Sequence, residues 1–214
     1  MFIDVHTHNI HHPDEVLPII NRYPDSYLLP STAFSIGIHP WYILEEKLCN
    51  ELLILEEKLQ HPNCYALGEC GLDKLSQTDF QLQLDVFKEQ IKLSEKFQKP
   101  LLIHCVKSFQ EIILLKKKTQ PKQPWIIHGF NKHFQVAKEL TKHGIFLSFG
   151  AALLQNKKLQ ETAKKVSLTT LFLETDNSKE SIISIYKKLS EIKEIELNLV
   201  KQEINKNYKH IFTT

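Results

Sequence analysis

Short apolar runs alternate with longer segments of helical periodicity along this 214-residue chain. Such alternation is typical of βα units around a parallel sheet, whose buried strands are nearly continuous in apolar residues. Seven of these runs are strong strand candidates: 2–5, 34–38, 64–67, 101–103, 125–127, 145–149 and 170–173. An eighth run, at 16–20, is a weaker candidate, because Pro18 cannot donate a hydrogen bond to a neighbouring strand.

Leucines recur at three- and four-residue steps from Leu44 to Leu59, which predicts a helix with one buried stripe. The same spacing from Phe80 to Ile91 predicts the next helix. Further helices are predicted at 109–118, 134–142, 157–165, 179–189 and 196–208.

Eight strands with their connections predict an α/β protein: a compact (β/α)8 TIM-like barrel that occupies residues 1–214 as a single domain. The chain is shorter than the usual barrel of about 250 residues, so some connections must be trimmed. The segment 9–34 leaves little room for a helix between the first two strands and is the expected place. A doubly wound open sheet is the alternative architecture.

Composition narrows the possible partners. An apolar fraction of 42% supports a sizeable core, and a net charge of +2 gives no argument for a large nucleic-acid interface. Arg22 is the only arginine, so phosphate would have to be held by lysine, backbone amides or metal.

The four cysteines form no C-x-x-C pair and are expected to be reduced. No apolar run approaches the roughly 20 residues of a membrane span, and the amino terminus does not have the pattern of a signal peptide. We therefore expect a soluble, cytoplasmic protein with no membrane partner.

Ionisable side chains follow directly after most of the apolar runs, although such residues are costly to bury without a partner. In the His-x-His pair after the first run, both imidazoles point to the same side of an extended segment. The carboxyl ends of barrel strands converge on one mouth, so the side chains that follow them would meet there. These side chains are His6, His8, His39, Glu69, His104, His128 and Asp176.

Six of these residues make good metal ligands: His6, His8, Glu69, His104, His128 and Asp176. One catalytic zinc needs only three protein ligands, so two ions that share a carboxylate use the set better. Mixed imidazole and carboxylate ligands suit Zn²⁺, Mn²⁺ or Fe²⁺ more than Ca²⁺.

Structural alternatives exist for single members of this set. His39, before Pro40, could simply start the next helix, and Glu69 could be a loop carboxylate between glycines. Asp176 could cap the following helix, and a lone His104 or His128 could be a core histidine. Asp73 is interpreted as mostly structural.

Taken in order, these motifs resemble the TatD family of metal-dependent deoxyribonucleases, within the amidohydrolase-like barrels. The matching segments are IDVHTH at 3–8, GIHP at 37–40, GECGLD at 68–73, the helix at 81–90, IH at 103–104, HGF at 128–130, SFG at 148–150, ETD at 174–176 and the last helix at 205–212.

The resemblance implies a centre of two divalent ions, Zn, Mn or Mg. His6, His8 and Asp176 would hold one ion, His104 and His128 the other, and Glu69 would bridge them. A water activated by the two metals would attack the phosphodiester, with Asp176 as general base and His39 in contact with the phosphate or the leaving group. The resemblance implies a DNase of the 3′–5′ exonuclease type acting on strand ends, without a protein partner.

Departures from the family pattern leave a second function open. Family members often carry arginine where this chain has Val106; Lys107 follows it, and Arg22 could compensate. Asn177-Ser178 stands where the family favours a small residue and proline. The alternative is a metallohydrolase of the same scaffold acting on a small amide, lactone or phosphate ester. A non-catalytic binding protein is disfavoured, because every predicted ligand is present.

Overall fold

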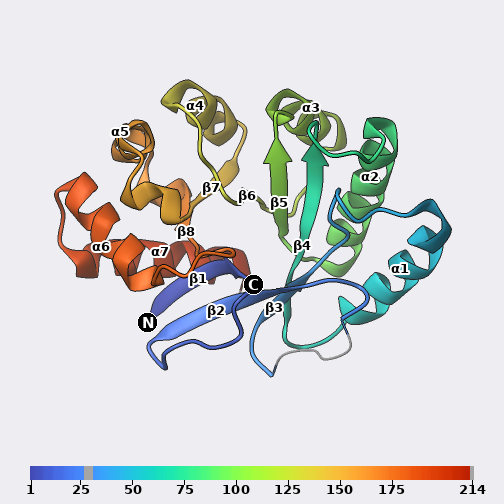
Figure 1. Cartoon of the computed structure of the whole chain (residues 1–214), viewed down its shortest axis with the longest axis horizontal. Coiled ribbons are helices and arrows are strands. Elements are labelled where there is room, and N and C mark those ends of the chain that lie inside the picture. Colours follow the sequence, from blue (N-terminus) through green and yellow to red (C-terminus); the bar gives the residue numbers. More distant parts are fainter. Residues whose placement is uncertain (27–30, 213–214) are drawn as a thin grey trace. The chain divides into compact units, whose positions relative to one another are not determined.

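The computed structural model describes residues 1–26 and 31–212, and in these residues the chain forms eight strands and seven α-helices (Figure 1). The strands are β1 (Phe2–Thr7), β2 (Val16–Arg22), β3 (Phe34–Ile36), β4 (Cys64–Asp73), β5 (Leu101–Val106), β6 (Trp125–Ile127), β7 (Ile145–Phe149) and β8 (Leu171–Leu173). The helices are α1 (Glu45–Lys58), α2 (Phe80–Phe97), α3 (Phe109–Thr119), α4 (Phe134–Lys142), α5 (Lys157–Lys165), α6 (Ile182–Lys193) and α7 (Leu197–Phe212).

In the sheet, the strands follow one another in chain order from β1 to β8. The pairs β2–β3, β3–β4, β4–β5 and β7–β8 are parallel. A doubly wound sheet would reverse direction at a switch point, so that alternative is wrong. The predicted TIM-like architecture is confirmed, including the trimmed connection: no helix lies in residues 8–15, between β1 and β2. That residues 1–214 form one domain stays a prediction, and its last two residues lie outside the described ones.

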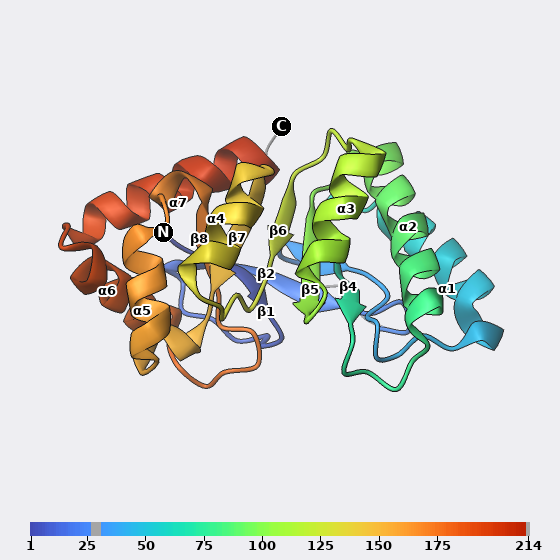
Figure 2. The same ribbon diagram turned by 90° about the horizontal axis from the view of Figure 1, so that it is seen from above.

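Two compact units make up the chain: residues 20–126, and residues 1–19 together with 127–214. In the first unit, α2 and α3 lie along β4 and β5 (Figures 1 and 2). β4 and β5 run parallel, with Gly71 opposite His104. In the second unit, β7 pairs with β8, and an isolated parallel bridge joins Thr7 at the end of β1 to Asp176 beyond β8.

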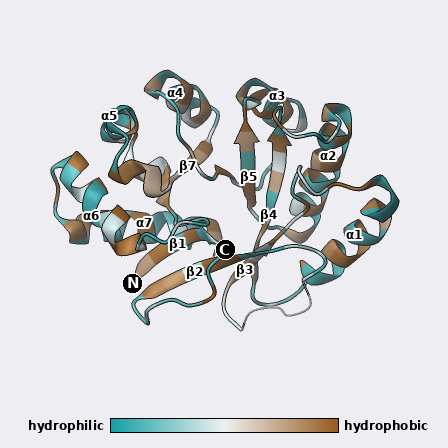
Figure 3. Cartoon of the chain, in the orientation of Figure 1, coloured by the Kyte–Doolittle hydropathy of each residue, from teal (hydrophilic) through white to brown (hydrophobic). Residues whose placement is uncertain are grey.

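The helices bury much of the stripes that their periodicity predicts, but not all: α2 buries Phe87 and Ile91, whereas in α1 only Leu55 is buried, and Leu44, before the first turn, is 44% exposed. Figure 3 shows β2 as mostly hydrophobic, whereas α1 and α2 alternate between hydrophobic and hydrophilic positions. α2 begins where the Asp79 side chain accepts a hydrogen bond from Leu82 N, and ends at Gln98 in the left-handed conformation. None of the helices in the described residues combines the length and hydropathy that a membrane crossing requires.

Four strands extend beyond their predicted ends: β1, which continues to Thr7, β2, which continues to Arg22, β4 and β5. β4 continues from Leu67 through Glu69 to Asp73, with a register shift between Leu67 and Cys70, and β5 continues to Val106. β2 is a strand in spite of Pro18, because the residues that pair with β3 are Ile20 to Arg22, and the missing N–H of Pro18 breaks none of these pairs.

Candidate metal centre

In the unit of residues 20–126, three predicted site residues surround one carboxylate. Glu69, on β4, is only 4% exposed, and its Oε1 lies 2.9 Å from His104 Nδ1 and 3.1 Å from His39 Nε2. The ligand atoms of these residues lie within 4.8 Å of one another. Because Glu69 belongs to a strand, it is not the loop carboxylate of the structural alternative.

The protonation of His39 follows from its backbone partner. Trp41 N donates a hydrogen bond to His39 Nδ1 (3.1 Å), so in the neutral ring Nδ1 carries the lone pair and Nε2 carries the proton. An N–H cannot ligate a metal, but it can donate to a carboxylate or a phosphate oxygen. His39 is therefore suited to substrate contact, and Glu69 and His104 are the ligand candidates of this group.

Buried amides set the positions of His39 and Glu69. Asn21 Oδ1 accepts a hydrogen bond from Glu69 N (2.8 Å). Gln90 accepts from Ile38 N (2.8 Å) and donates to Ile38 O (3.0 Å), which holds the segment before His39. Gln83, two turns earlier on α2, pairs in the same way with the backbone of Asp73 (2.8 and 3.1 Å). Sequence reasoning missed these roles, although two glutamines seven residues apart on an apolar helix face were a usable signal.

Asp73, expected to be mostly structural, lies beside His104. Its Oδ2 is 3.1 Å from His104 Nε2 and accepts a hydrogen bond from Trp41 Nε1 (2.6 Å). Burial raises the pKa of Asp73, but hydrogen bonds from Trp41, Leu75 N and His104 outweigh it and lower the pKa below its ordinary value. Asp73 thus orients His104 as well as closing the turn after β4.

The other unit holds a second group at the end of β1. Asp176 Oδ1 lies 3.6 Å from His6 Nε2 and 3.5 Å from His8 Nε2. Two ligand atoms bound at about 2.05 Å to one tetrahedral ion lie about 3.3 Å apart, so these distances fit a shared divalent ion. The donors, two imidazoles and a carboxylate, are those that Zn²⁺ or Mn²⁺ accepts.

Backbone contacts hold Asp176 in an unusual conformation. Its φ is +51°, its N donates to His6 O (3.0 Å), and its O accepts from His8 N (3.1 Å). Aspartate tolerates the left-handed region better than most residues, and non-glycine residues held there cluster at functional sites. Ser181, not Asp176, caps α6, so the capping alternative is wrong. The Asp176 side chain is 39% exposed and open to solvent.

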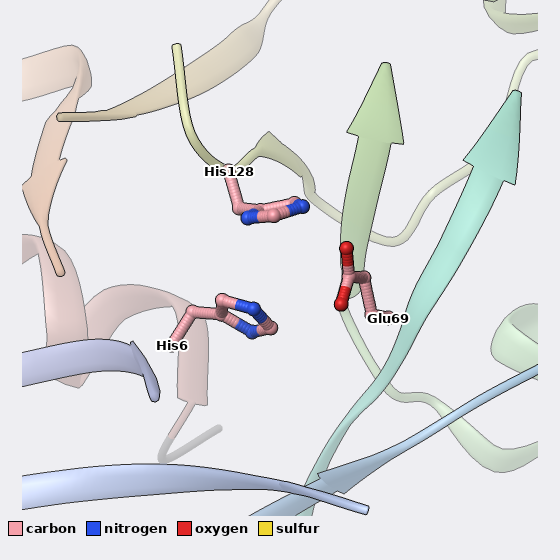
Figure 4. Close-up of side chains that lie close together, drawn as sticks. All are labelled: His6, Glu69 and His128. Atoms are coloured by element: carbon pink, nitrogen blue, oxygen red, sulfur yellow. The ribbon is translucent and has the colours of Figure 1, made fainter. Parts of the chain in front are cut away.

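His128 belongs to the same unit as His6, and their ring centroids lie 4.3 Å apart. Figure 4 shows both rings, together with Glu69 on β4. Glu174, fully buried, lies 3.5 Å from His128 Nδ1 and accepts a hydrogen bond from Gly129 N (2.6 Å). Metal-bound histidines commonly donate their second ring N–H to such a carboxylate, so His128 Nε2 is the candidate ligand atom.

A second buried carboxylate supports the end of β8. Asp4 accepts hydrogen bonds from Thr175 N (2.9 Å) and Thr175 Oγ1 (2.7 Å) and is fully buried. Burial raises its pKa to about 7. Sequence reasoning missed Asp4 and Glu174, and the signal for Asp4 was a carboxylate inside an apolar strand.

Gly71 controls how closely β5 approaches β4. Its φ is +136°, and a Cβ there would lie 2.1 Å from His104 O. We expect Gly71→Ala to lower the free energy of unfolding by more than about 3 kcal/mol. The matched Gly144→Ala, at φ +66° with nothing within 4 Å, should cost only about 1–2 kcal/mol. Urea denaturation of both variants checks this, and equal costs would contradict the close approach.

Comparisons with known proteins agree with this fold. An uncharacterized metal-dependent hydrolase from Buchnera aphidicola subsp. Baizongia pistaciae is 38% identical over 151 residues, which are 69% of this chain and 56% of that protein. Another, from Haemophilus influenzae, is 27% identical over 203 residues, or 85% of this chain and 77% of that protein. The chain thus spans little more than half the length of the first relative.

Two solved structures share the fold. The TatD homolog YjjV from Escherichia coli superposes with a TM-score of 0.87 at 22% identity, covering 100% of this chain and 98% of that one. A TatD family hydrolase from Entamoeba histolytica gives 0.80 at 20% identity, covering 99% and 97%.

The class is that of the matched relatives, which are named metal-dependent hydrolases, and this chain has donor groups that could hold a metal ion. A family model described as TatD related DNase matches residues 4–213, and the chain belongs to this family.

Proposed function

We propose that this protein hydrolyses phosphodiester bonds of DNA at strand ends, in a centre of two divalent ions built from the six predicted ligands. The observation that carries the proposal is the position of two donor groups, His6/His8/Asp176 and Glu69/His104, in the carboxyl-terminal halves of strands or shortly after them in a TatD family chain. Active sites of TIM-like barrels are built at these strand ends.

Each ligand has a proposed place. His6, His8 and Asp176 would hold one ion, His104 and His128 the other, and Glu69 would contribute to both. When bound, two divalent ions supply Lewis-acid polarisation of a phosphoryl oxygen and a more acidic water. Glu174 and Asp73 would keep the rings of His128 and His104 in the orientation that ion binding needs.

Proton transfer falls to two side chains of the chain itself. The solvent-accessible Asp176 carboxylate accepts the proton of the attacking water as general base. The Nε2–H of His39 donates a hydrogen bond to a phosphate oxygen or to the leaving oxygen as the P–O bond breaks.

Phosphates beyond the scissile bond need another cation. Lys107, exposed directly after β5, and Arg22, at the end of β2, are the candidates. Arg22 Nε is buried and has no hydrogen-bond partner among the described residues. Either side chain would supply the charge that Val106 does not, although lysine lacks the bidentate geometry of arginine.

The test is digestion of end-labelled single- and double-stranded DNA by the full chain with Mg²⁺, Mn²⁺ or Zn²⁺. We expect mononucleotides to be released from the 3′ end, and EDTA to abolish the reaction. Glu69→Ala, purified in parallel, controls for contaminating nucleases. Intact DNA together with hydrolysis of a small amide, lactone or phosphate ester would replace this proposal with the alternative substrate class.

A further inference from the structure

Beside His39, the unit of residues 20–126 contains a hollow of about 450 Å³ that no step above uses. Its volume lies within the range of about 300–1,000 Å³ typical of small-ligand sites. Part of its wall is aromatic (Tyr23, Trp41 and Tyr42), and part is charged (Asp25, Lys47 and Glu51). His39 also lines it, so a molecule in the hollow would touch the residue proposed to contact the phosphate.

The aromatic part is a rigid and accessible platform. Trp41 and Tyr42 are each 54% exposed, whereas Trp125, the only other tryptophan, is fully buried. The Trp41 ring is held by its hydrogen bond to Asp73 and lies 5.0 Å, centroid to centroid, from His39. Tyr42 lies 5.3 Å from the His39 ring and 5.4 Å from the Tyr23 ring. An exposed aromatic face of this kind can stack a flat base of a single strand.

The charged part indicates which portion of a nucleotide enters. Two carboxylates, Asp25 and Glu51, face one ammonium group, Lys47, which disfavours a phosphate in the hollow. Glu51 Oε2 is buried and accepts no hydrogen bond from the described residues. Burial, with the Asp25 charge nearby, raises the pKa of Glu51 in spite of Lys47. A neutral group with N–H donors would therefore form the most favourable hydrogen bonds with these carboxylates.

We propose that the hollow binds the base of a nucleotide adjoining the scissile phosphodiester, stacked on the Trp41 ring and in edge-to-face contact with Tyr42, whose plane is turned by 87° from that of Trp41, with the amino-bearing edge of the base toward Glu51. This inference rests on the proposed function, and it identifies the base as the part of the substrate that this hollow recognises. Bases with an exocyclic amino group, such as cytosine, should bind better than uracil or thymine.

Trp41 itself reports binding without turnover. We expect dCMP to change the tryptophan fluorescence of the metal-loaded full chain, dUMP to do so at about tenfold higher concentration, and deoxyribose 5-phosphate, which has no base, not to change it. The dCMP signal should vanish in Trp41→Phe, which keeps Trp125. A signal retained in Trp41→Phe, or equal for deoxyribose 5-phosphate, would overturn the base site, and equal titrations with dCMP and dUMP would remove Glu51 from it.

Kinetics separate this inference from the proposed function. Tyr42→Ala should raise KM for a single-stranded oligonucleotide about tenfold, but not for one whose terminal nucleotides lack bases. Tyr42→Phe should restore KM, and Leu53→Ala, at an exposed position on a different hollow of the same unit, should change nothing. If oligonucleotides with abasic and with intact terminal nucleotides are cleaved with equal KM, the base site is wrong but the proposed function stands. Base-dependent fluorescence without DNA cleavage overturns the proposed function alone.

Discussion

Glu69→Ala should abolish hydrolysis and lower the metal content of the purified protein. Glu69 Oε1 is the atom on which His104 and His39 converge, at 2.9 and 3.1 Å, and the carboxylate is almost fully buried. Its removal would take away the carboxylate that is proposed to share a metal ion with His104, and with it the negative charge that strengthens binding of a divalent ion. Metal ions contribute several kcal/mol to transition-state stabilisation, so we expect kcat/KM to fall at least about a thousandfold. Metal analysis should show at least one ion fewer per chain.

Two further variants make the Glu69 result specific. Glu69→Gln keeps the side-chain volume but removes the charge, and it should fail in the same way if ligation is the cause. Glu89→Gln removes an exposed carboxylate of the same unit, paired with Lys92, and should leave activity and metal content unchanged. Full turnover by Glu69→Ala would remove this residue from the mechanism.

Asp176→Asn is expected to lower kcat by about 10²–10⁴-fold, the usual contribution of a general base. Asparagine also tolerates the left-handed region, so the φ of +51° and the backbone hydrogen bonds to His6 and His8 should survive. The histidines remain as ligands, so substrate affinity should change much less than kcat. Steady-state kinetics, with circular dichroism as a check on folding, measures this effect.

The control for Asp176 is another exposed aspartate. Asp85→Asn on α2 breaks only surface contacts with Gln81 and Lys88 and should keep full activity. If Asp176→Asn kept its kcat but lost metal, Asp176 would be a ligand without a role in proton transfer.

Local sequence rules predicted most elements because their signals do not depend on distant residues. α4, α5, β6 and β7 lie at the predicted positions, since each is an apolar or amphipathic run with clear limits. β4 exceeds its prediction because Gly68 and Gly71, which usually mark a turn, serve here to let β5 approach closely.

The candidate ligands could be predicted for a similar reason. A histidine or carboxylate directly after a buried strand is recognisable from the sequence alone, and so is the order of such residues along a TatD family chain. Their support could not be predicted in this way. Asn21 and Glu174 are ordinary polar residues until the fold places an N–H group within hydrogen-bond distance of each.

The sequence by itself thus predicted most of the strands and helices and named the candidate metal ligands, because periodicity and residue chemistry are local properties. Only the tertiary structure decided which ring nitrogen of His39 carries the proton, that Asp73 supports His104, and that Trp41 and Tyr42 stand exposed beside the site. The first two features depend on atoms coming within about 3 Å of one another, since hydrogen bonds form only at such distances, and the third depends on which side chains the fold leaves uncovered.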